Sequence, residues 1–113
     1  MTSIRTQALL WYAQRTSAMV LALCVVVHLA TIIYAVRGGL TGAEILGRTQ
    51  GNWLFGAFYG VFVVACAVHA PIGVMNILGE LRGLHRIVAA VIAPLFALLI
   101  LVLGLRAVWA VVA

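Results

Sequence analysis

The chain has 113 residues, of which 66% are hydrophobic and 8% are charged, and its mean hydropathy is +1.25. Because soluble domains carry charges at about 25% of positions, this composition excludes an ordinary soluble enzyme. A transmembrane helix needs about 20 apolar residues to cross a core about 30 Å thick. The length therefore allows at most three such helices and leaves no room for a soluble domain.

Three apolar runs predict an all-α integral membrane protein with a single domain over residues 1–113. The expected spans cover about residues 16–37, 52–79 and 86–112, with loops over residues 37–52 and 79–86. No short apolar core followed by a small-residue cleavage site stands apart, so a secretory signal peptide is not expected. Three helices without soluble mass indicate half of a membrane helix bundle, which a partner anchor subunit completes.

The basic residues indicate how the chain is oriented in the membrane. All seven are arginines and most lie at the ends of segments rather than in a patch, so we do not expect nucleic-acid binding. The N-terminal segment and second loop together carry four of them, and the first loop carries two. This asymmetry favours a cytoplasmic N-terminus. The four are Arg5, Arg15, Arg82 and Arg86, and the two are Arg37 and Arg48.

Polar and small residues within the first two spans recur at helical spacing. Because polar groups are expensive in the hydrocarbon core, each set is expected to face another helix rather than lipid. The first set is Ser17, Leu21, Cys24, His28 and Thr31, and the second is Cys66, His69, Gly73, Asn76 and Glu80.

The two histidines have two interpretations. Each imidazole can be a hydrogen-bonding residue in helix packing, or it can ligate a cofactor, since neutral imidazole is a common axial ligand of haem iron. Gly73, one turn after His69, would let a flat macrocycle approach the backbone. Arg15, just before the first apolar run, can pair with an anionic group such as a haem propionate or act only as a boundary anchor. Pro71 is expected to bend the second helix beside His69.

Residue counts from the span ends give the depth of each histidine. They place His69 between about 4 and 10 Å nearer the cytoplasmic side than His28. One haem shared by both is possible only at the small end of that interval. Separate sites, each completed by another chain, are the preferred interpretation.

Two stretches together resemble the haem-binding membrane anchor subunits of succinate dehydrogenase and fumarate reductase. The first is WYAQRTSA, Trp11 to Ala18, which is similar to the family's N-terminal signature of an arginine followed by Ser or Thr and a small residue. The second is HAPIGVMNILGEL, His69 to Leu81, in which a histidine is followed four residues later by glycine and an acidic residue ends the helix. The three-span plan matches as well.

This resemblance implies roles for particular residues. His69 matches the axial ligand of haem b in the second helix, and His28 has a counterpart in anchors that carry two haems. Arg15 matches an arginine that contacts a haem propionate or lies near the quinone, and Ser17 matches the hydroxyl residue beside it. The chain departs from the pattern at Glu80-Leu81, where many relatives have Asp-Tyr with the tyrosine bonded to quinone, so the residue that bonds quinone is left open.

The resemblance implies a function for the whole chain. It would be the cytochrome b subunit of a succinate- or fumarate-quinone oxidoreductase in a bacterial cytoplasmic membrane, passing electrons between an iron–sulfur subunit and quinone through one or two haems b per anchor pair. Its partners would be the flavoprotein, the iron–sulfur protein, a second anchor, membrane lipid and quinone. The chemistry on the dicarboxylate belongs to another subunit, so no catalytic residue is expected here. The alternative is a small structural, assembly or transporter subunit without haem, and a third possibility is an anchor that binds only quinone.

Overall fold

The computed structural model describes residues 2–81 and 83–113. Over these residues the chain forms only helices: α1 (Ile4–Gly38), α2 (Gly42–Thr49), α3 (Trp53–Leu78), α4 (His85–Ile87), the π-helical turn η1 (Val88–Ile92) and α5 (Ala93–Val112). Three segments are long and apolar enough to cross a membrane, namely Ile4–Gly38, Trp53–Leu78 and His85–Val112. The prediction of an all-α chain with three such helices is confirmed. Arg82, one of the arginines used to orient the chain, lies outside the described residues.

Helix α1 begins much earlier than the expected span. Ser3 caps its first turn by accepting a hydrogen bond from the Thr6 backbone N–H at 3.2 Å. The helix then runs unbroken to Gly38, which gives it 35 residues. A helix of that length measures about 52 Å, longer than the apolar core of a bilayer. Its N-terminal turns therefore extend beyond the core or follow its surface.

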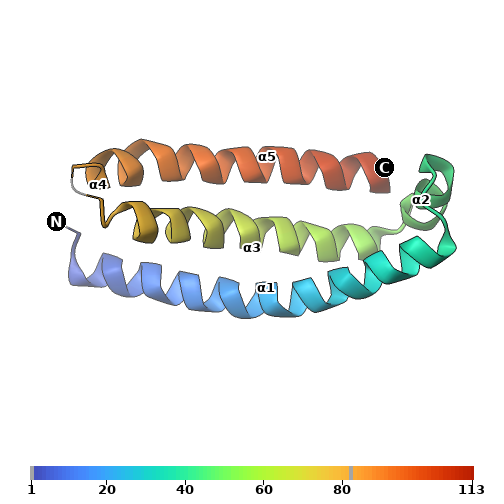
Figure 1. Ribbon diagram of the computed structural model, residues 1–113, viewed down its shortest axis with the longest axis horizontal. Helices are drawn as coiled ribbons and strands as arrows, with labels where there is room; N and C mark the ends of the chain where they lie inside the picture. Colours follow the sequence, from blue (N-terminus) through green and yellow to red (C-terminus); the bar gives the residue numbers. More distant parts are fainter. Residues whose placement is uncertain (1, 82) are drawn as a thin grey trace.

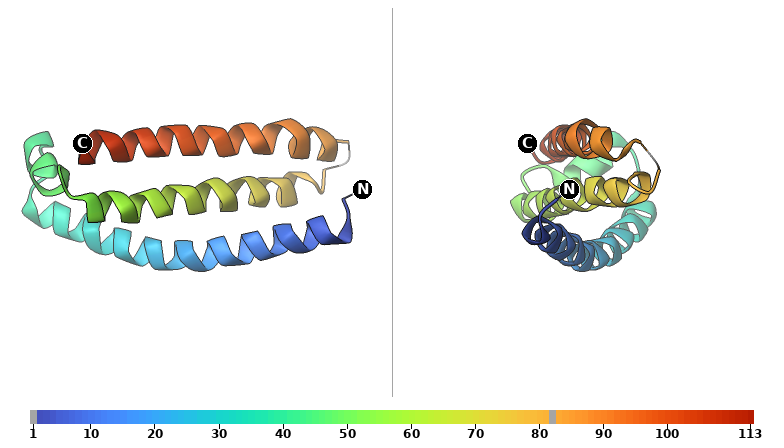
Figure 2. Two further views of the ribbon diagram at one scale, coloured as in Figure 1. Left: turned by 180° about the vertical axis from the view of Figure 1, so that it is seen from behind. Right: turned by 90° about the vertical axis from the view of Figure 1, so that its left-hand side faces the viewer.

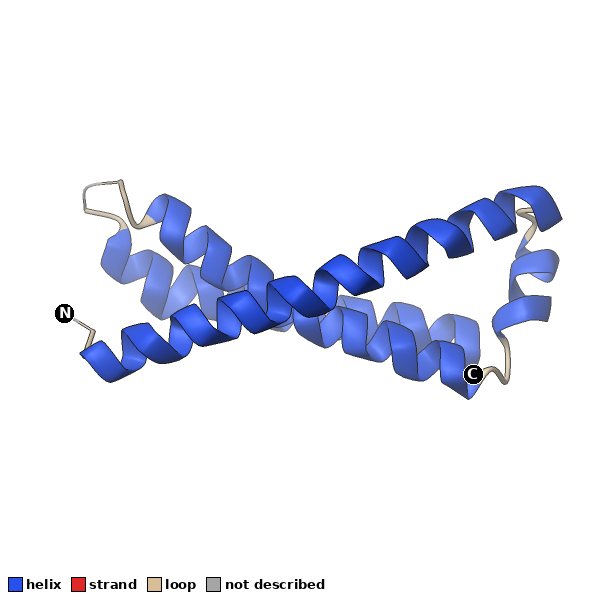
Figure 3. Ribbon diagram, turned by 90° about the horizontal axis from the view of Figure 1, so that it is seen from below, coloured by secondary structure: helices blue, strands red, loops and turns tan. Residues whose placement is uncertain are grey.

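The three long helices form an open layer rather than a closed bundle. Helix α3 lies in the middle and packs against α1 on one side and α5 on the other (Figure 1). Viewed along the layer, α1 is inclined across the α3–α5 pair (Figure 3). The layer measures 51 × 23 × 21 Å, and most side chains of the three spans remain exposed in the single chain.

Glycines allow α3 and α5 to approach closely. A methyl group on Gly104 of α5 would lie 2.6 Å from a methyl of Val63, and one on Gly56 of α3 would lie 3.2 Å from a methyl of Val112. Both distances are shorter than ordinary carbon–carbon contacts. The α3–α5 pair thus forms the tightly packed half of the layer, and it holds α3 in place for its contacts with α1.

The first loop was expected to be irregular but contains helix α2. Thr41 and Glu44 form a reciprocal capping box, in which the Thr41 hydroxyl accepts from the Glu44 N–H and the Glu44 carboxylate accepts from the Thr41 N–H at 2.9 Å. At the other end of α2, the Thr49 hydroxyl donates to the Val111 carbonyl at 2.7 Å. Helix α2 is thereby attached to the last turn of α5, at the C-terminal end of the layer (Figure 2).

Both prolines lie inside or beside long helices without ending them. Pro71 is buried within α3, which continues to Leu78. Pro94 follows the π-helical turn and occupies the first turn of α5, where a missing N–H is tolerated. The backbone irregularity of the third span is therefore the wide turn at Val88–Ile92, just before its proline.

Candidate functional site

His69 of α3 lies against Ser17 of α1, in the contact between the two helices. The Nδ1 atom of His69 is 3.4 Å from the Ser17 hydroxyl oxygen. That hydroxyl also donates to the backbone carbonyl of Gln14 at 3.1 Å. Ser17 is buried, with 6% of its surface exposed. Two residues that the sequence analysis selected separately are thus direct neighbours.

The two contacts of Ser17 favour one tautomer of the imidazole. A hydroxyl has a single proton, and when Ser17 donates it to the Gln14 carbonyl, its oxygen can accept from Nδ1–H of His69. A neutral imidazole protonated on Nδ1 carries its lone pair on Nε2. This is the tautomer that a metal ligand needs when it binds through Nε2.

His28 of α1 has the converse arrangement with α3. Its Nδ1 atom is 2.9 Å from the hydroxyl of Tyr59. The His28 ring packs edge-on against the rings of Tyr59 and Phe62, with centroids 5.6 Å apart in each case. Each membrane histidine is thus hydrogen-bonded at Nδ1 by a hydroxyl group of the other helix.

The two histidines lie further apart in depth than the sequence suggested. Ser17, the neighbour of His69, is eleven residues from His28 on α1, which corresponds to about 16 Å along the axis. The expected offset of about 4 to 10 Å was too small, because residue counts from the ends of the spans do not reveal how α1 and α3 are aligned against each other. At this separation the two side chains cannot ligate one iron, which supports the interpretation of separate sites.

Burial agrees with the predicted inward face of α1 and only partly with that of α3. In the first set Ser17 and Cys24 are buried, and Leu21, His28 and Thr31 are half-buried. In the second set Cys66, His69 and Gly73 are half-buried, but Asn76 and Glu80 are exposed. Glu80 also lies beyond the end of α3, after its C-cap Gly79. The α3 stripe thus meets α1 only over its first three members.

Gly73 provides space for a side chain of α1. A methyl group on Gly73 would lie 3.6 Å from Nε2 of Gln14, so the amide of Gln14 occupies the position where an open surface for a macrocycle was expected. The other amide atom, Oε1, is buried and has no hydrogen-bond partner in the described part of the chain. Gly73 therefore lets α1 and α3 come together next to the Ser17–His69 pair.

Arg15 is not adjacent to His69. Residues two positions apart in a helix are separated by about 200° around its axis, so Arg15 and Ser17 point to different sides of α1. The Arg15 guanidinium lies over the Trp11 ring, 5.5 Å from its centroid, and the side chain is exposed. It lines a pocket of about 870 Å³ that His69 does not line. The structure thus brings Ser17, His69 and Gly73 together and leaves Arg15 elsewhere.

A second pocket, of about 480 Å³, lies at the other end of the layer and is lined by His28 and Tyr59. Its rim includes Arg48, which donates to the Gly39 carbonyl at 2.6 Å and lies over the ring of Tyr34, 5.9 Å from the centroid. These contacts tie α2 to the end of α1. The His28 hydrogen bond therefore borders an apolar cavity rather than facing open lipid.

Sequence reasoning missed Tyr59 and Gln14. Tyr59 carries a hydroxyl in the middle of an apolar run, which is itself a signal of a polar partner within the membrane. Gln14 precedes the first apolar run by one turn, and the sequence analysis assigned a role to its neighbour Arg15 but none to Gln14. Neither partner could be assigned from spacing within one helix, because each contact depends on the alignment of α1 against α3.

The residues present fit one axial position of a haem rather than a polydentate metal centre. Among residues 2–81 and 83–113, no three His, Cys, Asp or Glu side chains come together in a way that could hold a metal ion. His69 offers an Nε2 lone pair with its Nδ1 oriented by Ser17, as bound histidines usually require. The third histidine, His85, lies beside Gly79, ten residues and about 15 Å along α3 from His69.

Comparisons of the chain with protein-family models, with curated protein sequences and with solved structures find no match.

Proposed function

We propose that this chain is the haem b-binding membrane anchor of a succinate- or fumarate-quinone oxidoreductase. The observation that carries the proposal is the part-buried contact of His69 Nδ1 with the Ser17 hydroxyl, which also bonds to the Gln14 carbonyl. With Ser17 donating to Gln14, His69 would keep its proton on Nδ1 and leave Nε2 free to ligate iron. The resemblance of WYAQRTSA and HAPIGVMNILGEL to that family supports it, because Ser17 and His69 belong to those two motifs. In the proposed complex the chain resides in a bacterial cytoplasmic membrane with its N-terminus in the cytoplasm.

In this proposal the chain's own residues bind and orient rather than catalyse. His69 supplies one axial nitrogen, Ser17 holds its Nδ1 proton, and the Gln14 carbonyl orients the Ser17 hydroxyl. A haem bound there would supply one-electron transfer between an iron–sulfur subunit and membrane quinone. Oxidation or reduction of the dicarboxylate takes place in a flavoprotein subunit.

The geometry supports a requirement for a second anchor. If a haem held by His69 took a second protein ligand, another residue would have to supply it. His28 lies about 16 Å and His85 about 15 Å from His69 along the helices, so neither reaches the same iron. An identical or homologous anchor packed on the open layer would supply that ligand. A haem on His28, held through Tyr59, would be a second and separate site.

The experiment is a dithionite-reduced minus oxidised spectrum of the detergent-purified complex, with haem counted per copy of the chain. If one site is used, we expect a b-type signal that His69→Ala abolishes and His28→Ala leaves in place. If two sites are used, each substitution should remove part of the signal. His85→Ala is the matched control, since it removes the histidine outside the α1–α3 contact, and it should leave the spectrum unchanged. A complex that assembles with no haem in any form refutes the proposal.

A second candidate function has one observation in its favour. Both histidines already have hydroxyl partners within the chain, as expected for residues that join helices in a membrane. The chain would then be a small structural, assembly or transporter subunit. In that case His69→Ala and Ser17→Ala would lower stability by similar amounts, and the purified protein would contain no haem.

A further inference from the structure

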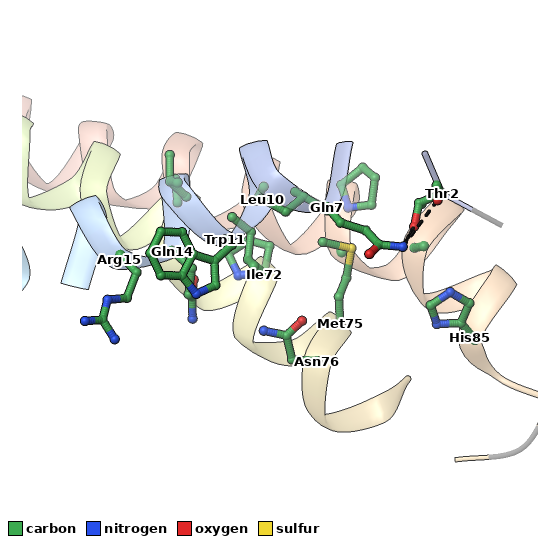
Figure 4. Close-up of a pocket in the computed structure, with 17 residues that line it drawn as sticks. Thr2, Gln7, Leu10, Trp11, Gln14, Arg15, Ile72, Met75, Asn76 and His85 are labelled. Atoms are coloured by element: carbon green, nitrogen blue, oxygen red, sulfur yellow. Dashed lines mark hydrogen bonds between the residues drawn. The ribbon is translucent and has the colours of Figure 1, made fainter. Parts of the chain in front are cut away.

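The pocket that Arg15 lines has no part in the proposed haem site. Its volume, its hydrogen-bond donors and its apolar wall are features of a ligand-binding site. It is a cavity of about 870 Å³, within the range of small-molecule sites. It lies near the N-terminus, between the first turns of α1, the last turns of α3 and the start of the third span, and all three contribute to its wall. Figure 4 shows it from the side, and we call it the Arg15 pocket.

The depth of the Arg15 pocket coincides with one edge of the apolar core. From Trp11 to Tyr34 helix α1 rises about 34 Å, close to the thickness of a bilayer's hydrocarbon region. Aromatic residues of this kind mark the membrane–water boundary. The Arg15 guanidinium lies over Trp11, so its charge is near this boundary. Thr2 and Gln7 line the pocket on the water side of Arg15, and Ala67 lines it about 6 Å deeper, as the Ser17–His69 contact aligns the two helices.

One edge of the pocket is rich in hydrogen-bond donors, and no acidic residue lines the pocket. The Arg15 guanidinium and the side-chain amides of Gln14 and Asn76 lie along one edge (Figure 4). Neither acidic residue of the chain, Glu44 or Glu80, lines the pocket. Among the described residues Arg15 forms no ion pair, and its only cation contact is with Trp11. A guanidinium beside donor amides is a recognition group for phosphate.

Most of the remaining pocket wall is apolar. It is formed largely by alanines and aliphatic side chains, among them Ala67, Ile72, Ala89 and Ala97. Small side chains leave a surface along which a hydrocarbon chain can lie, and Ala67 and Ala97 continue it deeper than Arg15. A basic, donor-rich edge beside an apolar wall between membrane helices is the combination that binds anionic lipid headgroups.

We propose that the Arg15 pocket binds one anionic phospholipid, with its phosphate at Arg15 and an acyl chain along the alanine wall. The proposal does not depend on haem, because His69 does not line the pocket. Arg15 and Ser17 then serve different ligands from different sides of α1. The bound lipid would fill the space between the N-terminal half of α1 and the third span.

The test is native mass spectrometry of the full-length chain in detergent, titrated with phosphatidylglycerol, phosphatidylcholine or glycerol 3-phosphate. We expect a one-to-one adduct with phosphatidylglycerol that survives where the phosphatidylcholine adduct is lost, and no competition by glycerol 3-phosphate. Arg15→Gln should weaken the adduct about fivefold, as expected for one arginine at the membrane surface. Arg5→Gln is the matched control on the same helix outside the pocket, and it should change binding less than twofold.

A second pair of variants tests whether the lipid occupies the pocket, without altering charge. Ala89→Phe places a ring in the pocket, whereas Ala90→Phe places one on a neighbouring exposed position that does not line it. We expect only Ala89→Phe to reduce phosphatidylglycerol binding. Equal losses for Arg15→Gln and Arg5→Gln would show unspecific charge attraction and overturn the proposal. Binding unaffected by Ala89→Phe, or full competition by glycerol 3-phosphate, would overturn it as well.

Discussion

The close packing of α3 against α5 gives a quantitative prediction for two glycines. Replacing an exposed helical glycine by alanine usually stabilises a helix by about 0.5 to 1 kcal/mol. At Gly104 the added methyl would lie 2.6 Å from Cγ1 and 2.8 Å from Cγ2 of Val63. Valine in a helix has one strongly preferred rotamer and cannot turn away, so overpacking of about 1 to 3 kcal/mol is expected. Gly104→Ala should therefore be destabilising by up to about 2.5 kcal/mol.

Gly60 is the matched control for this substitution. It also lies in a membrane helix, but a methyl group there would meet nothing within 4 Å. Gly60→Ala should be neutral or slightly stabilising. The assay is reversible unfolding of the chain in mixed micelles by increasing SDS, followed by circular dichroism and tryptophan fluorescence.

Two outcomes decide whether the packing argument is right. The destabilisation by Gly104→Ala should be relieved when Val63→Ala is added, because the clashing methyl groups are then gone. Interaction between contacting sites of this kind is what a double-mutant cycle measures. If Gly60→Ala and Gly104→Ala shift the unfolding midpoint equally, or if Val63→Ala brings no relief, the α3–α5 contact is not as close as described.

Two further predictions concern hydrogen bonds at the ends of the layer. Tyr59→Phe removes the hydroxyl partner of His28 and should lower the free energy of unfolding by about 0.6 kcal/mol, at most about 1.7, as for other hydrogen bonds between membrane helices; a cycle with His28→Ala measures it, and zero coupling would contradict the bond. Hydrogen bonds from the Thr41 N–H and hydroxyl, aided by the charge of Arg48, lower the pKa of Glu44 from its ordinary value of 4.5. Because the folded pKa is depressed, the stabilisation is present above that value and is lost as pH falls through the lower, folded pKa. NMR titration of Glu44 should show this depression in the native chain and a smaller one in Thr41→Val, which keeps the N–H bond and loses the hydroxyl bond. An ordinary pKa in the native chain would count against the capping box.

The sequence predicted the helices better than the contacts between them. Hydropathy located the second and third spans to within a residue or two of α3 and the His85–Val112 segment, because apolar length is a property of one helix. Periodicity likewise predicted the inward face of α1. The start of α1 was missed although Ser3 and Thr6 form a readable N-cap. Helix α2 was missed although Thr41 and Glu44 have the spacing of a capping box.

The partners of the two histidines could not be predicted from spacing alone. Periodicity shows which residues share a face, but not how far one helix is displaced along another or at what angle it crosses. Those quantities depend on packing contacts, here on glycines such as Gly73, whose neighbour is Gln14. A shift of α1 by one turn would place a different residue against His69. The Ser17–His69 distance is therefore a result of the structure, as is the separation of Arg15 from both.

The antiparallel alignment of α1 and α3 explains why the two histidine contacts are alike. Ser17 and His28 are eleven residues apart on α1, and Tyr59 and His69 are ten apart on α3. Both intervals are about three helical turns, so both pairs fall on one line of contact with the order of hydroxyl and imidazole reversed. Because three turns also correspond to about 16 Å of depth, the same geometry that repeats the contact prevents the two imidazoles from meeting. His28 and His69 could therefore bind only separate cofactors. For the proposed haem, the number of haems per chain would distinguish one occupied site from two.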